Sequence, residues 1–137
     1  MTNFGKEIER LAEKYKKRFR AVSKGSVEKT IEIMQTTKGN AGRLPLDTGF
    51  LRASLGANIG SMPSGESVNP GGSFSYTGTA TSVALLKWKP ERGEVFYAGY
   101  TAMYARFMEA ENGFLRGAVE LWPRTVNEVA QKVKASI

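Results

Sequence analysis

The amino-acid sequence predicts an α+β fold, with an antiparallel β-meander of three to four strands packed by a long N-terminal helix and a C-terminal amphipathic helix. Apolar residues recur at helical spacing near both ends of the chain, whereas the stretch between about residues 50 and 100 holds short apolar segments divided by turn residues. The 137 residues, 41% of them hydrophobic, suit one ordinary domain. We therefore expect a single domain over 1–137, with an N-terminal helical segment (1–38), a flexible loop (61–72) and C-terminal helices (101–137).

The N-terminal segment has the periodicity of an amphipathic helix. Six apolar residues follow one another at spacings of three or four and share one face: Phe4, Ile8, Leu11, Tyr15, Phe19 and Val22. The next apolar residue, Val27, comes five positions later. Because glycine weakens a helix, we expect a kink or break at Ser23-Lys24-Gly25 and a second helix after it. The apolar face is expected to pack on the sheet or, alternatively, against a neighbouring subunit.

Turn residues separate the predicted strands. Pro45 cannot continue a helix, and Asp47-Thr48-Gly49 has the composition of a turn in which glycine tolerates positive φ. Alternating apolar residues after this turn predict a strand at about 50–60: Leu51, Ala53, Leu55, Ala57 and Ile59. Two further strands, 82–89 and 94–100, are predicted to pair as an antiparallel hairpin. Residues 73–77 are a candidate fourth strand.

The stretch 61–80 is rich in Ser, Thr, Gly, Pro and Asn, and such a composition buries little apolar surface. A loop of this length in a small domain is usually functional or disordered. We expect its first part to be flexible and to gain order from contacts outside its own domain. This part comprises Ser61, Met62, Pro63, Ser64, Gly65, Glu66, Ser67, Val68, Asn69, Pro70, Gly71 and Gly72.

The C-terminal segment predicts at least two helices. Thr101 can cap a short helix over 102–109, and Asn112-Gly113 ends it. Apolar residues then alternate spacings of four and three, which is typical of a long amphipathic helix: Leu115, Val119, Trp122, Val126, Val129 and Val133. Pro123 removes one backbone hydrogen bond, so we expect a kink or division at Trp122.

The composition argues against an enzyme. The sequence has no cysteine and no histidine, which rules out disulfides, thiolate metal sites and imidazole acid–base catalysis. The carboxylates form no convincing catalytic cluster, and no glycine-rich phosphate loop is present. We therefore predict no catalytic residues, metal, cofactor or small-molecule substrate. Without a signal peptide or an apolar run near the ~20 residues of a membrane span, a soluble protein with no membrane partner is expected.

The net charge of +7 is concentrated near the N-terminus, where residues 1–38 hold ten basic and five acidic side chains. A basic helix face of this size could meet nucleic acid, an acidic protein surface or only water. Because acidic side chains are mixed into it, the face is more typical of a solvated helix. Direct nucleic-acid binding is therefore an alternative function from another class.

Two groups of residues together resemble a known family. The first is Leu46-Asp47-Thr48-Gly49-Phe50-Leu51-Arg52-Ala53-Ser54-Leu55 after an N-terminal helix. The second is Tyr104-Ala105-Arg106-Phe107-Met108-Glu109, followed by Gly113-Phe114-Leu115-Arg116-Gly117-Ala118 and a final helix. In this order they resemble the head–tail joining (neck, tail-completion or tail-component) proteins of long-tailed bacteriophages. The sequence departs from that family's pattern by Ala110-Glu111-Asn112 before Gly113 and by a longer 61–72 stretch.

The resemblance implies a structural virion protein that oligomerises into a ring at the head–tail junction and is needed for tail completion and head–tail joining. Its partners would be copies of itself and neighbouring neck and tail proteins, with genomic DNA passing through the channel without sequence-specific binding. It would be assembled in the host cytoplasm and located in the virion. A tail terminator ring that caps the tail tube is the alternative within this class.

In this interpretation the motif residues have structural roles, and the loop 61–72 is a candidate contact to the rings above and below. The motif residues are Asp47, Thr48, Gly49, Leu51, Arg52, Tyr104, Glu109, Phe114, Leu115 and Ala118.

Overall fold

The computed structural model describes residues 3–63, 65 and 67–136. Residues 1, 2 and 137 of the predicted domain, and Ser64 and Glu66 of the predicted loop, lie outside the described residues. The elements are α1 (Asn3–Met34), η1 (Lys38–Asn40), α2 (Phe50–Ala53), β1 (Leu55–Ile59), α3 (Thr79–Lys87), η2 (Pro90–Arg92), β2 (Phe96–Tyr100), α4 (Ala105–Asn112), α5 (Phe114–Glu120) and α6 (Trp122–Ser136), where η marks a 3₁₀ helix. The fold is therefore α+β, with a long N-terminal helix and a two-stranded antiparallel sheet.

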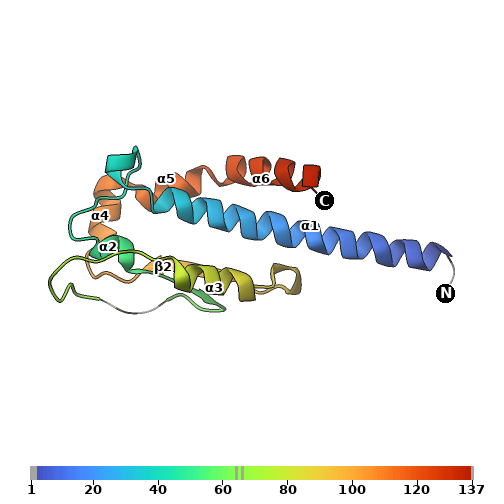
Figure 1. The fold of residues 1–137 in the computed structure, drawn as a ribbon, viewed down its shortest axis with the longest axis horizontal. Coiled ribbons are helices and arrows are strands. Elements are labelled where there is room, and N and C mark those ends of the chain that lie inside the picture. The colour runs from blue at the N-terminus through green and yellow to red at the C-terminus, as the bar shows by residue number, and fades with distance from the viewer. Residues whose placement is uncertain (1–2, 64, 66, 137) are drawn as a thin grey trace.

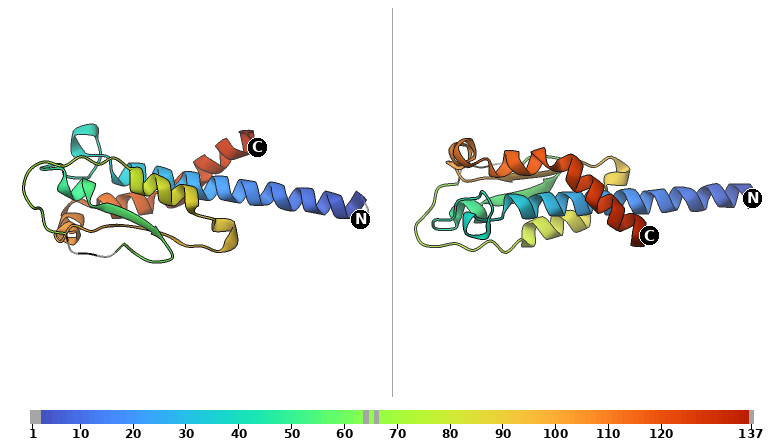
Figure 2. Two further views of the ribbon diagram at one scale, coloured as in Figure 1. Left: turned by 60° about the horizontal axis from the view of Figure 1, so that its bottom comes forward. Right: turned by 90° about the horizontal axis from the view of Figure 1, so that it is seen from above.

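Helix α1 is the axis of the molecule (Figure 1). Helices α5 and α6 pack along one side of its C-terminal half, and the sheet with α3 lies on the other side. The N-terminal half of α1 extends well beyond these layers in all three ribbon views (Figures 1 and 2). The fold thus has a compact body at one end and a single projecting helix at the other.

The expected kink at Ser23-Lys24-Gly25 was wrong, because α1 runs as one helix from Asn3 to Met34. Gly25 does not interrupt the helix; it allows another helix to pack closely against α1. A Cβ placed on Gly25 would come within 2.8 Å of Cγ1 of Val129 on α6, a distance that real Cβ atoms do not show. The missing side chain therefore lets α6 approach α1 closely.

The predicted hairpin was also wrong. Strand β2 matches the prediction for 94–100, but it pairs with β1 in antiparallel register, from Leu55 opposite Tyr100 to Ile59 opposite Phe96. The predicted strand 50–60 is divided, because residues 50–53 form the helical turn α2 before β1 begins. Leu51 and Leu55 are both buried, and a spacing of four fits a helical turn as well as an alternating strand.

Residues 82–89, predicted as a strand, lie almost entirely in helix α3. The helix follows Gly78, which has a φ of 73°. Its buried positions are Thr81 and Ala84, and Trp88 just after it is buried too, a spacing of three and four that is typical of a helix. Residues 73–77, the candidate fourth strand, are not in a strand either. Among the described residues the meander is thus reduced to two strands.

The C-terminal helices follow the prediction more closely. The short helix is α4, and Gly113 ends it with a φ of 65°, as predicted. It begins at Ala105 after Tyr104, so the predicted cap at Thr101 was wrong: the hydroxyl of Thr101 donates instead to the carbonyl of Ser54 at 3.0 Å. The chain then divides at Trp122, where α5 gives way to α6, as Pro123 led us to expect. None of the described helices combines the length and the apolar character needed to cross a bilayer.

The core consists of two adjoining clusters. One contains Ile31, Met34, Leu55 and Ala118, and the other contains Leu44, Leu51, Ala102 and Phe114. Tyr100 packs against both clusters and meets the ring of Phe114 edge-on, with the ring centroids 5.1 Å apart. The body of the molecule is therefore held together around the C-terminal end of α1.

Candidate functional site

The predicted turn at Asp47-Thr48-Gly49 is a close-packed junction. Gly49 is buried and has a φ of 84°, a left-handed conformation that favours glycine. A Cβ at Gly49 would lie 2.2 Å from the carbonyl oxygen of Phe74, so this position has neither the conformation nor the space for a side chain. Asp47 itself is exposed at the rim of a small hollow that Tyr104 also lines.

Thr48 fastens the end of the long loop to this turn. Its carbonyl accepts a hydrogen bond from the N–H of Phe74 at 2.8 Å, and its hydroxyl accepts one from Nδ2 of Asn69 at 3.2 Å. Phe50 strengthens the contact, since its ring meets the ring of Phe74 edge-on at 5.2 Å. The turn therefore holds the loop at Asn69 and Phe74.

Ser67 is a second attachment point of the loop. Its N–H donates to the carbonyl of Thr101 at 2.7 Å, and its carbonyl accepts from the N–H of Met103 at 2.8 Å. Its hydroxyl donates to Oγ1 of Thr101 at 3.1 Å. The loop thus makes hydrogen bonds within its own domain, which its Gly- and Ser-rich composition did not predict. Its suggested contact with other rings stays a prediction.

Arg52 joins the segment after the turn to the end of α1. Its Nε donates to the carbonyl of Gln35 at 3.0 Å, while Nε2 of Gln35 donates to the carbonyl of Arg52 at 2.9 Å. The guanidinium carbon also lies 5.3 Å from the centre of the Tyr76 ring. The side chains of Arg52 and Gln35 each bond to the other residue's backbone carbonyl. Arg52 therefore has a structural role, which is to hold α2 against the end of α1.

Tyr100 completes this network from β2. Its hydroxyl donates to Oε1 of Gln35 at 2.6 Å. Burial raises the pKa of Tyr100 well above its usual range, with the phenol of Tyr76 adding to the effect. The phenol is therefore held in its neutral form, as a hydrogen-bond donor.

Glu109 has a definite role that the sequence did not reveal. It lies on α4, and its carboxylate accepts hydrogen bonds from the N–H groups of Leu115 and Arg116, both at 2.8 Å. These donors are in the first turn of α5 and would otherwise lack intrahelical partners. A negative group is also favoured at a helix N-terminus. Glu109 of α4 thus caps the N-terminus of α5, and the spacing between Glu109 and the Phe114 segment in the motif corresponds to this contact.

The remaining motif residues have packing roles or lie at the surface. Leu51, Phe114 and Ala118 are buried in the core, whereas Leu115 is partly exposed. Tyr104 precedes α4 and stacks at a tilt near the ring of Phe50, with the centroids 6.3 Å apart. The structure therefore brings the turn, α4 and the start of α5 together at the end of the molecule opposite the projecting helix.

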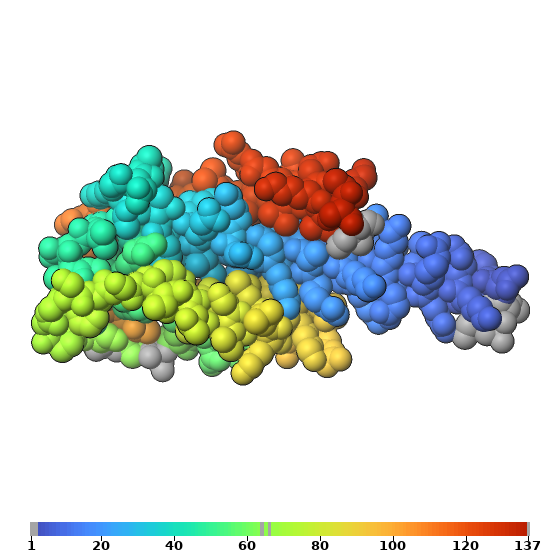
Figure 3. Space-filling model, viewed as in Figure 1, coloured from blue at the N-terminus to red at the C-terminus, as the bar shows by residue number. Residues whose placement is uncertain are grey.

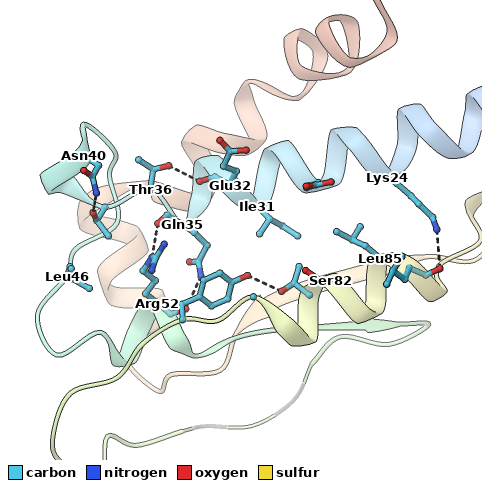
Figure 4. Close-up of a pocket in the computed structure, with 16 residues that line it drawn as sticks. Lys24, Ile31, Glu32, Gln35, Thr36, Asn40, Leu46, Arg52, Ser82 and Leu85 are labelled. Carbon is cyan, nitrogen blue, oxygen red and sulfur yellow. Dashed lines mark hydrogen bonds between the residues drawn. The ribbon is translucent and has the colours of Figure 1, made fainter. Parts of the chain in front are cut away.

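An open groove of about 870 Å³ runs between α1 and α3 (Figure 4). Ile31 and Leu85 supply apolar wall, and Glu32 lies at its α1 edge. The two cationic groups in it are engaged, since Lys24 donates to the carbonyl of Leu86 at 3.2 Å and Arg52 is bound to Gln35. In the part of the chain that the structure describes, no group of three or more acidic side chains is placed to hold a metal ion.

The projecting half of α1 carries an extended apolar surface that is exposed. Its five large apolar side chains, which we call the apolar stripe, are 42–75% exposed. The stripe consists of Phe4, Ile8, Leu11, Tyr15 and Phe19. Figure 3 shows this half extending past the other segments of the chain. The expectation that the stripe packs on the sheet was therefore wrong for these five residues.

The sequence did not indicate that Gln35, Tyr76, Thr101 and Asn69 hold other residues of the site in place, although it placed Asn69 in the loop and Thr101 before a helix. The polar Gln35 at the end of an apolar helix face was the signal available for one of them. The other three become visible only when segments far apart in the chain are brought together. Comparison with family models, with characterised proteins and with solved structures gave no match to this chain.

Proposed function

We propose that this protein is a structural component of a phage virion, which oligomerises into a ring at the head–tail junction and is needed for tail completion and head–tail joining. The exposed apolar stripe is the observation that carries the self-association in this proposal. A contiguous exposed apolar face of this size often serves as an interaction surface. The motif residues support the same interpretation. Each motif residue whose contacts are defined helps to shape the fold or to hold its segments together.

The coding neighbourhood provides the first test. If the proposal is right, the genes on either side should encode capsid, portal and tail-tube proteins. A neighbourhood of metabolic or regulatory genes would contradict it.

The second test is complementation of a phage that lacks this gene. Loss of the protein should leave free heads and free tails, which electron microscopy can count. Replacing 61–72 by a four-residue turn changes the loop-closure entropy by only ~1 kcal/mol. It also removes the hydrogen bonds of Ser67 and Asn69 to the body, so circular dichroism must first show that the variant folds. The replacement should nevertheless impair joining if the loop contacts a neighbouring ring. Normal particles from the null phage would overturn the proposal, whereas normal particles from the loop variant would remove only the role of the loop.

A nucleic-acid-binding function is the second candidate, favoured by the charge of the projecting helix. Residues 3–20 carry seven basic and three acidic side chains. Binding by such a surface should weaken steeply as salt increases. An affinity for DNA or RNA that persists at physiological salt and is lost when Lys14, Lys16 and Lys17 are changed to Gln would favour this candidate.

A further inference from the structure

We infer that the apolar stripe of α1 binds the same stripe of a second copy, in an antiparallel pair related by a twofold axis near Leu11. The inference depends on residues of α1 alone and not on the proposed virion role. A ring would need a further contact elsewhere on the subunit. The two proposals can therefore fail separately.

The first argument is the area of the stripe. An aromatic side chain carries about 150–250 Å² of surface, and Phe4, Tyr15 and Phe19 are 75%, 68% and 55% exposed. With Ile8 and Leu11 the stripe offers on the order of 500 Å² of apolar area, comparable to the largest patch on a typical monomer. Two stripes together would bury on the order of 1,000 Å², which is about the threshold for a specific interface.

The second argument is continuity with a face that is already covered. Continuing from Phe19 in steps of three or four, the same face of α1 reaches Val22 and Ser26, and Ser26 is fully buried. Here α6 runs back along α1 in the opposite direction, with Val129 against Gly25 (Figure 1). An antiparallel helix therefore already occupies this face in the body of the protein. The second copy's α1 would supply a helix of the same orientation to the uncovered part.

The third argument is the symmetry of the stripe. Phe4 and Phe19 lie seven and eight residues from Leu11, while Ile8 and Tyr15 lie three and four residues from it. A twofold axis near Leu11 thus places an aromatic end against an aromatic end, over about 22 Å of helix. Self-complementary contacts of this kind are what a twofold interface requires.

The fourth argument is charge, which selects the antiparallel orientation. Glu7 and Lys14 are seven residues apart, so they lie on one flank of the stripe, and Glu9 and Lys16 lie likewise on the other flank. Antiparallel pairing brings Glu7 near Lys14 of the second copy, and Glu9 near Lys16. Parallel pairing would instead bring one flank of the stripe against the other flank of the second copy, placing Glu7 near Glu9 and Lys14 near Lys16, which is repulsive.

Sedimentation of the full chain tests whether the pair forms. We expect a concentration-dependent dimer, and Leu11→Glu should raise its dissociation constant by roughly 100-fold or more, since both copies carry the change. The stripe is exposed and lies outside both core clusters, so circular dichroism should show the variant folded. Leu86→Glu is the matched control, because Leu86 is 79% exposed on α3, outside the stripe. A wild-type monomer at all accessible concentrations, or a dimer unaffected by Leu11→Glu, would overturn the inference.

Cross-linking tests the orientation, and the absence of native cysteine makes it clean. Glu7→Cys and Lys14→Cys chains, one of them carrying a size tag, are mixed and oxidised. Antiparallel pairing predicts the mixed disulfide as the main product. Lys17→Cys, on the opposite face of the helix, should not cross-link. Preferential linkage of Glu7→Cys to a Glu9→Cys chain would show a parallel pair and contradict the inference.

Discussion

The two halves of α1 carry the same kind of apolar face but differ in what covers it. Residues 22–34 lie between two layers, with Ile31 and Met34 in the core and Ser26 fully buried. Residues 3–19 continue the same helix into solvent, with the apolar stripe exposed. Amphipathic periodicity therefore indicates that a face will be covered, but not whether the cover comes from the same chain.

The largest expected difference between the halves concerns matched isoleucines. Ile31→Ala should destabilise the fold by about 2–5 kcal/mol, because it leaves a cavity in the core. Ile8→Ala should change the stability by no more than about 0.5 kcal/mol, since Ile8 is half exposed. Urea unfolding at a protein concentration where the chain is monomeric measures both. Equal losses would mean that the two halves are equally covered within one chain.

The anchored end of the molecule should also be sensitive at Gly49. Gly49→Val would force a β-branched residue into positive φ and against the carbonyl of Phe74, at a cost of about 2–4 kcal/mol. Gly60→Val is the control, because Gly60 has a similar φ of 89° but no atom within 4 Å of an added Cβ. The thermal melting temperature should fall further for the Gly49 variant. Equal shifts would mean that backbone strain alone matters at the turn.

Gly25 marks the boundary between the halves, and substitution there should have a smaller effect. Gly25→Leu should push α6 away from α1 and destabilise the fold by about 1–3 kcal/mol, despite leucine's better helix propensity. Ala12→Leu, at an exposed position of the projecting half, should be close to neutral at a protein concentration where the chain is monomeric. Denaturant unfolding of both variants is the measurement. A stabilised Gly25→Leu variant would show that α6 tolerates displacement.

The smallest effect concerns pH at the covered end. Because burial raises the pKa of Tyr100 above the usual value of about 10, the folded state holds this proton more tightly than the unfolded state. The contribution is fully present below pH 10 and should be lost above it, by about 1 kcal/mol between pH 10 and 11. Urea unfolding across this range should show the fall in the wild type and less of it in Tyr100→Phe. Identical profiles would assign the alkaline loss to other groups.

Sequence reasoning worked where local chemistry decides the structure. Helical spacing predicted that the N-terminal segment is helical, although not that it forms one unbroken helix, and Pro123 predicted the division at Trp122. It failed where tertiary packing decides, since a glycine that admits a neighbouring helix has the same local signature as one that breaks a helix. The prediction of a strand at residues 82–89 failed because a short apolar run fits a strand or a buried helix equally well.

The pairing of the strands and the contacts of the motif residues could not be predicted from the sequence for a related reason. The partner of β2 lies more than thirty residues away, across the loop and α3. The motif positions were identified in advance, but the contacts of Glu109 and Thr48 depend on how distant segments meet. The composition of the loop did not reveal that Ser67 and Asn69 are bound to the body.

Hydrogen exchange of the α1 backbone, measured at low and high protein concentration, tests the central claim most directly. We expect amides of residues 22–34 to be protected at both concentrations. Amides of residues 5–19 should exchange rapidly in dilute protein and become protected as the second copy binds. Strong protection of residues 5–19 in dilute monomer, or none at any concentration, would contradict it.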